Sequence, residues 1–291
     1  LLMLGQPENR FDNVPRRIVD FIKLVLGQTR VVADPAGWIH FFIFWGFLIL
    51  SVATINHVGD GLFPGFRIPF ITSPAMSLLV DITGVVVLVA VAAALYRRMV
   101  IRPARLKYGS PDAYIVLSFI TILMITMFIV EGTEIAANDF PWPYALPVGS
   151  LFAIPMSGLG EGGLKVLNAI AWWLHSFTLL GFLVYIPSSK HLHLLGCPPN
   201  EFFHSLRPKG ALRPIEDMEN AESFGVSKIT QFTWKQLLDL YACTECGRCK
   251  EVCPAALSGK PLVPRDFILD LKHYLLDHGS DILASNGKTE A

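Results

Sequence analysis

The sequence contains little charge and few cysteines. Of its 291 residues, only 16% are Asp, Glu, Lys or Arg, against roughly a quarter in a typical soluble domain, while 52% are hydrophobic. The 24 basic and 24 acidic residues leave no net charge, which argues against nucleic acid as a partner. The same composition excludes a disordered chain, a coiled coil and, with 5 cysteines, a disulfide-stapled secreted fold. The remaining class is a membrane protein with a smaller soluble part.

The hydrophobic residues are concentrated in four stretches, in which Asp81 is the one charged residue: 35–59, 77–96, 113–130 and 166–189. About 20 apolar residues cross a bilayer as a helix, and none of the stretches alternates as a strand would. We therefore expect an all-α integral membrane protein with at least four transmembrane helices. Asp81 is expected to be solvated or hydrogen-bonded.

The basic residues predict how these helices are oriented. Residues 97–107 contain five basic residues and no acid, whereas residues 131–163 contain no basic residue. By the positive-inside rule, residues 1–34, 97–111 and the chain after Lys190 lie in the cytoplasm. Residues 14–26 have the spacing of an amphipathic helix that lies along the membrane surface.

The chain divides by composition into three parts. Residues 1–34 form a cytoplasmic amphipathic segment, residues 35–194 the transmembrane domain and residues 195–291 a soluble domain. This last part contains 11 basic and 13 acidic residues and begins with connectors rich in Pro and Gly. We expect an upstream helix to be missing, because the chain begins with Leu1 rather than Met. We also expect the soluble domain to be truncated, because it contains one cluster motif only.

The most informative segment is CTECGRCKEVCP, which runs from Cys243 to Pro254. Its spacing, C-x2-C-x2-C-x3-C-P, is that of bacterial ferredoxins and predicts a [4Fe–4S] cluster bound by Cys243, Cys246, Cys249 and Cys253. A zinc knuckle or a redox dithiol is the alternative, but zinc sites usually separate two such cysteine pairs by a dozen or more residues. Helical patterns on both sides of the run favour a helical ferredoxin-like domain.

Cys253 has two assignments. In two-cluster ferredoxins the fourth cysteine of each run binds the other cluster, and no second run follows before Ala291. Either Cys253 completes a single cluster, or it binds a second cluster whose motif lies beyond this chain. Cys197 has no partner cysteine nearby and is predicted to be an inert thiol or a lipidation site.

Histidines inside the apolar stretches predict a second kind of cofactor site. Of 8 histidines, four lie in or at the ends of the first and last stretches: His40, His57, His175 and His193. Ionisable residues within a membrane are costly and usually functional, and two imidazoles on facing helices can bind a haem b. The alternative is that these side chains anchor the helices at the interface or join them by hydrogen bonds.

The spacing of these histidines predicts how they pair. His175 and His193 are 18 residues apart, which is five turns of a regular helix. The first and last helices are antiparallel, so His40 can face His193 near the cytoplasm and His57 can face His175 near the outside. His191 is the alternative to His193, but on a regular helix it lies about 160° away from the face that carries His175 and His193.

The stretch LHSFTLLGFLVYIPSSKHLH, from Leu174 to His193, resembles the last helix of the respiratory nitrate reductase gamma subunit family. Together with CTECGRCKEVCPA and KPLVPRDFILDLK, it resembles the membrane-bound iron–sulfur oxidoreductases related to heterodisulfide reductase. That branch includes enzymes that pass electrons from electron-transfer flavoprotein to menaquinone. The resemblance extends from about Pro15 to Gly279.

The resemblance implies two b-type haems, one bound by His40 and His193 and an outer one bound by His175. The chain departs from the gamma family in one respect. The other outer ligand of that family falls ten residues after the first, where this chain has Leu50, so His57 must substitute for it. The family's second cluster motif and its cysteine-rich CCG repeats are not in this sequence.

The resemblance also implies a function and a location. The protein would be a quinone-linked oxidoreductase in the prokaryotic cytoplasmic membrane, with its iron–sulfur domain in the cytoplasm. It would pass electrons between quinone and a cytoplasmic partner, an electron-transfer flavoprotein or a reductase subunit. The alternatives are a quinol-oxidising subunit that feeds a heterodisulfide or sulfur reductase, and a non-catalytic membrane anchor that conducts electrons.

Overall fold

Helices make up most of the described part of the chain. The computed structural model describes residues 1–63, 65–106, 111–208, 210–211, 218–220 and 225–285. The structure is 73% helical, and within these ranges it contains no strand, only an isolated bridge between Gln6 and Thr233. The predicted all-α class is confirmed.

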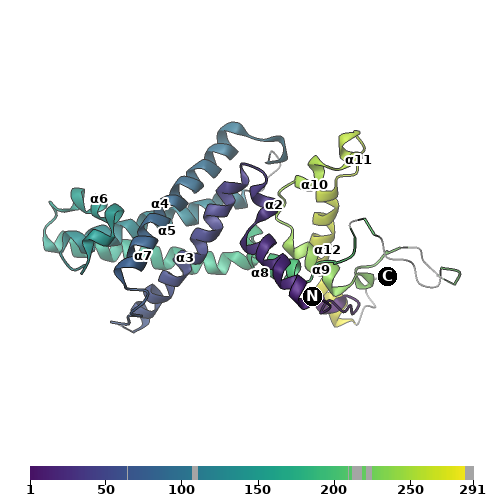
Figure 1. Cartoon of the computed structure of the whole chain (residues 1–291), viewed down its shortest axis with the longest axis horizontal. Helices are drawn as coiled ribbons and strands as arrows, with labels where there is room; N and C mark the ends of the chain where they lie inside the picture. Colours follow the sequence, from purple (N-terminus) through teal and green to yellow (C-terminus); the bar gives the residue numbers. More distant parts are fainter. Residues whose placement is uncertain (64, 107–110, 209, 212–217, 221–224, 286–291) are drawn as a thin grey trace. The chain divides into compact units, whose positions relative to one another are not determined.

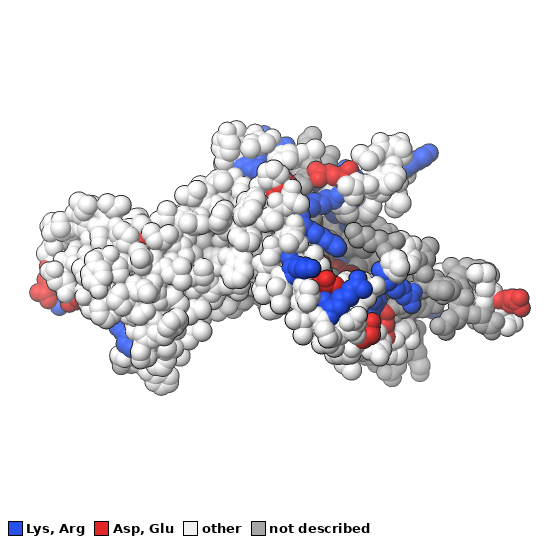
Figure 2. Space-filling view, viewed as in Figure 1, with Lys and Arg blue, Asp and Glu red and all other residues white. Residues whose placement is uncertain are grey.

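The chain folds as two compact units. One, the span unit, comprises residues 30–103 and 110–187, and the other, the cysteine unit, comprises residues 1–29, 104–109 and 188–291. The first 29 residues therefore pack with the C-terminal part of the chain. From the sequence, residues 1–34 were expected to form a separate segment. Charged side chains are sparse over the helices of the span unit and frequent on the cysteine unit (Figure 2). The division into three functional parts stays a prediction.

Four helices of the span unit are long and apolar enough to cross a membrane, as predicted. They are α3 (Gly37–Leu62), α4 (Pro74–Tyr96), α5 (Asp112–Ala136) and α7 (Glu161–Tyr185). Helix α4 continues through a π-helical turn to Ile101, and α7 continues through a 3-10 turn to Ser188. The third helix is longer than the apolar stretch suggested, because it extends through Glu131 and Glu134 to Ala136.

Helix α5 is the centre of the span unit, where it packs against α4, α6 (Pro147–Met156) and α7, while α3 packs against α4 (Figure 1). Glycines allow close approach. A Cβ atom on Gly46 of α3 would lie 2.2 Å from a methyl group of Val87 of α4, and one on Gly132 of α5 would lie 2.9 Å from Phe152 of α6. Small residues at such contacts are typical of membrane helices, which associate by close packing.

Asp81 joins α4 to α6, a helix that the sequence did not predict. Its side chain is fully buried, and its two carboxyl oxygens accept hydrogen bonds from the backbone N–H groups of Val148 (3.0 Å) and Gly149 (2.9 Å). These N–H groups belong to the first turn of α6, where they have no partner within the helix. Asp81 is therefore hydrogen-bonded, one of the two states expected for it, and it caps a helix 67 residues away in the chain.

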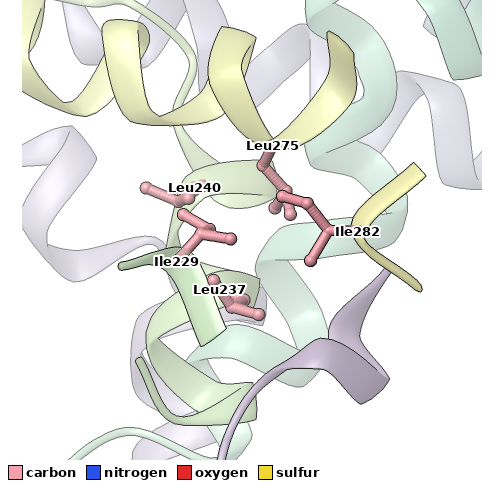
Figure 3. Close-up of a cluster of buried hydrophobic side chains, with 5 residues drawn as sticks. All are labelled: Ile229, Leu237, Leu240, Leu275 and Ile282. Atoms are coloured by element: carbon pink, nitrogen blue, oxygen red, sulfur yellow. The ribbon is translucent and has the colours of Figure 1, made fainter. Parts of the chain in front are cut away.

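The cysteine unit is built around a small helical core. Helix α9 (Trp234–Ala242) packs against α12 (Pro264–Ala284), and a 3-10 turn at Ile229–Gln231 precedes α9. The buried side chains at the centre are Ile229, Leu237, Leu240, Leu275 and Ile282 (Figure 3). The short helices α2 (Thr29–Val32), α10 (Arg248–Glu251) and α11 (Pro254–Leu257), with 3-10 turns at Ala104–Leu106 and Pro143–Ala145, complete the two units.

The N-terminal residues contribute to this core. Leu1, Leu2 and Leu4, of which Leu2–Leu4 form a 3-10 turn, pack against its side chains. The backbone N–H of Gln6 donates to the carbonyl of Phe232 (2.8 Å), and the backbone N–H of Trp234 donates to the carbonyl of Gln6 (3.1 Å). These bonds attach the start of the chain to the start of α9.

Helix α1 (Val14–Phe21), followed by a π-helical turn at Ile22–Leu26, packs against α8 (His193–Phe202). The sequence places Arg17 away from the apolar face, but its side chain is 1% exposed. Its guanidinium donates to the carbonyls of Asp12, Phe202 and His204, and it forms an ion pair with the Asp12 carboxylate. Arg17 thus satisfies carbonyl groups at the C-terminal end of α8.

We expect Asp81→Asn to lower the free energy of unfolding by about 2 to 4 kcal/mol, because an amide can accept only one of the two N–H groups and turns its own NH2 towards the other. Unfolding in detergent, followed by circular dichroism, measures the change. Glu161→Gln is the matched control, because its carboxylate pairs with Lys165 on an exposed surface, where an ion pair contributes little. Equal stability of the two variants would contradict this role of Asp81.

Candidate cofactor sites

The four cysteines of the predicted cluster site follow α9. The Thr233 hydroxyl accepts from the backbone N–H of Gln236, and the Gln236 side chain accepts from that of Thr233, so the helix begins with a reciprocal cap. It ends at Cys243, whose backbone is extended and whose N–H donates to the carbonyl of Leu240 (3.3 Å). The first cysteine therefore lies directly at the C-terminal end of a packed helix.

The chain then turns twice through left-handed backbone conformations, at Glu245 (φ 56°) and Gly247 (φ 74°). Gly247 precedes α10, which carries Cys249, and Cys253 precedes α11, which begins with Pro254. A residue with a side chain is strained at a positive φ, so glycine is favoured at position 247. The turns and short helices distribute the four thiols along a compact segment.

All four thiols are free, with Cys246 and Cys249 exposed and Cys243 and Cys253 partly buried. Burial raises the pKa of the Cys243 thiol, while a hydrogen bond from the Glu245 backbone N–H and the charge of Lys272 act in the opposite direction. A backbone N–H directed at the sulfur and a nearby ammonium group both favour a thiolate, the form that binds metal.

Within the described part of the chain, no three His, Cys, Asp or Glu side chains converge so that they could hold one metal ion. A [4Fe–4S] cluster binds one thiolate at each of its four irons, and the run supplies four free thiols at the spacing of such sites. The residues present fit this group in type, number and order.

Residues 243–253, which we call the cluster loop because they carry the predicted cluster cysteines, contact the segment that contains His193. The ammonium of Lys190 pairs with the carboxylate of Glu245 at 2.7 Å, and both side chains are largely buried. In α8, a Cβ atom on Gly196 would lie 3.2 Å from the carbonyl oxygen of Tyr241, and the Cys197 thiol donates to the carbonyl of Ala242 at 3.5 Å. The helix that begins at His193 thus packs directly on the last turn before Cys243.

The structure corrects the helical geometry expected for His193. Helix α7 ends at Tyr185, two 3-10 turns follow at Ile186–Ser188 and Lys190–Leu192, and His193 begins α8. Ser189 between the turns has an extended backbone. His175 and His193 therefore do not lie on one regular helix, and the argument that places them on one face five turns apart is wrong. Pro187 lies within the first turn, where it breaks the regular helix.

His193 nevertheless has a defined orientation. Its Nδ1 lies 2.6 Å from the carbonyl oxygen of Lys190, which can only accept, so Nδ1 carries the proton of the neutral ring. Burial lowers the pKa of His193, which favours the neutral imidazole that binds metals. The ring of His191 lies 5.3 Å away.

His57 and His175 are brought together. They lie on α3 and α7 with ring centroids 4.9 Å apart, and Trp172 lies 5.1 Å from His57. The ring nitrogens have hydroxyl neighbours: Nε2 of His57 lies 3.1 Å from Oγ of Ser176, and Nδ1 of His175 lies 3.0 Å from Oγ1 of Thr126. Two imidazoles on facing apolar helices are the donor set of a bis-histidine haem b, so these residues fit that group.

His40 is exposed in the first turns of α3, in the span unit, whereas His193 belongs to the cysteine unit. The pairing of these two side chains stays a prediction. Thr126 and Ser176 were not predicted as neighbours of the histidines. For Thr126 a signal was present: Thr126 and Thr133 are seven residues apart, as are Asn168 and His175.

We expect iodoacetamide at about pH 8 to modify Cys246 and Cys249, and to leave Cys197 largely unmodified, in protein treated with an iron chelator. Burial raises the pKa of the Cys197 thiol to about 11, so roughly one thiol in a thousand is the reactive thiolate. Mass spectrometry of the peptides measures the modification, and unfolded protein, in which all sites react, is the control. Modification of Cys197 at the rate of Cys246 would disprove its burial.

Comparison with known proteins gives two relatives over most of this chain. It is 38% identical over 284 residues to the probable iron-sulfur-binding oxidoreductase FadF of Bacillus subtilis. This alignment covers 97% of this chain and 40% of that protein. The chain is 32% identical over 289 residues to the EtfAB:quinone oxidoreductase of Syntrophomonas wolfei, covering 92% of this chain and 39% of that protein. The chain thus spans about two fifths of the length of these two relatives.

A third relative matches a shorter region. The probable membrane-anchored ferredoxin of Chromohalobacter salexigens is 46% identical over 56 residues, which are 19% of this chain and 8% of that protein. No protein-family model matches the chain, and no solved structure matches it significantly. The predicted resemblance to membrane iron–sulfur oxidoreductases is confirmed, because this chain is similar to proteins of these names. The resemblance of the last apolar stretch to the nitrate reductase gamma subunit stays a prediction.

Proposed function

We propose that this chain passes electrons between a cytoplasmic redox protein and the membrane quinone pool, through a [4Fe–4S] cluster and haems b. The observation that carries the proposal is the pair of imidazoles, His57 and His175, which face each other between two helices of membrane-spanning length. The ferredoxin-type cysteine run of the same chain supplies the second redox site.

The chain would hold these groups with its own side chains. Cys243, Cys246 and Cys249 would bind the cluster, and Cys253 would either complete it or serve a second one. His57 and His175 would bind the outer haem, and His40 with His193 the haem on the cytoplasmic side. When bound, the cluster and the haems supply reversible one-electron transfer. The protein orients them, excludes water and sets their potentials by burial and hydrogen bonding.

The surface of each unit suits a different redox partner. The cysteine unit is charged and carries exposed thiols, which suits a water-soluble partner such as an electron-transfer flavoprotein. The span unit exposes apolar side chains along its helices, which suits lipid and a lipid-soluble quinone. The name of the Syntrophomonas relative, EtfAB:quinone oxidoreductase, combines the same two partners. By the positive-inside rule, the cysteine unit would lie in the cytoplasm.

Cys249→Ser is expected to abolish the [4Fe–4S] signal of the reduced protein, because a hydroxyl replaces one of the three thiolates that wrap the cube. Iron and sulfide analysis with low-temperature EPR measures the loss. Cys197→Ser is the control and should keep the signal, since Cys197 lies outside the ferredoxin-type run and its thiol donates to the carbonyl of Ala242. A protein that contains zinc and no iron would refute the assignment.

His193→Ala should remove one of two b-type haems, whereas His191→Ala should leave the haem content nearly unchanged. The reason is the hydrogen bond from Nδ1 of His193 to the carbonyl of Lys190, which orients the ring as ligating histidines generally are. Optical spectra and haem extraction measure the content. If His191→Ala loses the haem and His193→Ala keeps it, the ligand is His191.

A further inference from the structure

Thr126 of α5 makes a hydrogen bond with a predicted haem ligand inside the span unit. Its side chain is 2% exposed, and its hydroxyl oxygen lies 3.0 Å from Nδ1 of His175 on α7. The same oxygen lies 2.7 Å from the carbonyl oxygen of Ile122 and 3.1 Å from that of Leu123, one turn earlier in α5. Three polar atoms therefore share one hydroxyl group in an apolar setting.

These distances determine the direction of each hydrogen bond. A carbonyl oxygen can only accept, so an oxygen–oxygen distance of 2.7 Å requires the single hydroxyl hydrogen to point at Ile122. The hydroxyl has no second hydrogen for the imidazole. Nδ1 of His175 must therefore carry a hydrogen and donate it to Thr126, which leaves the lone pair of the neutral ring on Nε2.

We propose that Thr126 is a positioning residue for an iron-ligating His175: it holds the ring as the Nδ1–H tautomer, so that Nε2 is the nitrogen that binds haem iron. The inference rests on the proposed function, because it takes His175 as a haem ligand. Ligating histidines generally donate their other N–H to a polar acceptor, which fixes the orientation of the ring and raises the basicity of the ligating nitrogen. In this chain the closest acceptor is a side-chain hydroxyl of the neighbouring helix, and the backbone carbonyl of Leu123 lies beside it.

A second hydrogen bond shows that α5 and α7 keep this register over two turns. Nδ2 of Asn168 donates to Oγ1 of Thr133 at 2.8 Å, and that hydroxyl donates in turn to the carbonyl of Val130 at 2.8 Å. Thr133 lies seven residues after Thr126, and Asn168 lies seven residues before His175. Both threonines thus donate to a carbonyl of their own helix and accept from α7, at levels about 10 Å apart.

This pair of contacts supplies a matched control. Thr133→Val removes a threonine-to-α7 hydrogen bond of the same kind, in the same helix interface, but at a level without histidine. Thr126→Val removes the acceptor of His175 with almost no change in side-chain volume. Thr126→Ser keeps the hydroxyl and should restore the behaviour of the unmodified chain. Any effect of general helix packing should appear in both valine variants.

The first measurement is haem binding and potential, with the full chain in detergent or nanodiscs. We expect Thr126→Val to weaken binding of one haem by roughly 10- to 100-fold, and to raise its reduction potential, because a less basic imidazole stabilises ferric iron less. Thr126→Ser and Thr133→Val should retain the affinity and potential of the unmodified chain. Haem titration and a redox titration followed optically give these values.

The second measurement does not need haem. Nitrogen NMR of the haem-free chain, labelled with ¹⁵N-histidine, distinguishes the two tautomers, and His175→Ala identifies the signal of His175. We expect the Nδ1–H form in the unmodified chain and in Thr133→Val, and a mixture of tautomers in Thr126→Val. An Nε2–H form in the unmodified chain would overturn the inference.

The results also separate this inference from the proposed function. If the unmodified chain binds haem and Thr126→Val matches Thr133→Val in affinity, potential and tautomer, the role of Thr126 is wrong while the proposed function stands. If the unmodified chain binds no haem after reconstitution, both are wrong, whatever tautomer His175 adopts.

Discussion

The arrangement of the span unit depends on hydrogen bonds that polar groups between its apolar helices form within the protein. Asp81 accepts from two N–H groups of α6, and Thr126 and Thr133 accept from His175 and Asn168 of α7. An unpaired polar group in hydrocarbon costs several kcal/mol, so each of these contacts restricts how the helices can rotate or slide. Association by packing alone would leave such rotations much freer.

The cysteine unit depends instead on a hydrophobic core made from distant parts of the chain. Leucines from the first four residues pack with side chains of α9 and α12, and Arg17 binds the carbonyls at the end of α8. The cluster loop has no core of its own. Its position comes from the helices on either side and from the ion pair between Lys190 and Glu245. The same segment therefore carries His193 and supports the start of the cysteine run.

Much of this arrangement could be predicted from the sequence. The four spanning helices follow from the length of the apolar stretches, and α9 follows from its pattern and its Thr233 cap. The prediction failed where a local signal was absent or misleading. Helix α6 is short and contains Pro155, so it does not resemble a span. Pro187 favours a break after Tyr185, but it does not specify the two 3-10 turns and the new helix at His193 that follow.

The sequence by itself determined which segments are long and apolar enough to cross a membrane, which cysteines have the spacing of an iron–sulfur site, and which relatives the chain resembles. Each of these depends on residues that are close in the chain, or on the order of residues along it. Tertiary structure alone decided that His57 faces His175, that Asp81 caps α6, and that Thr126 accepts from His175. These partners are 118, 67 and 49 residues apart in the chain. The rotation of each helix about its axis selects them, and that rotation is set by packing and hydrogen bonding between helices rather than by any local pattern.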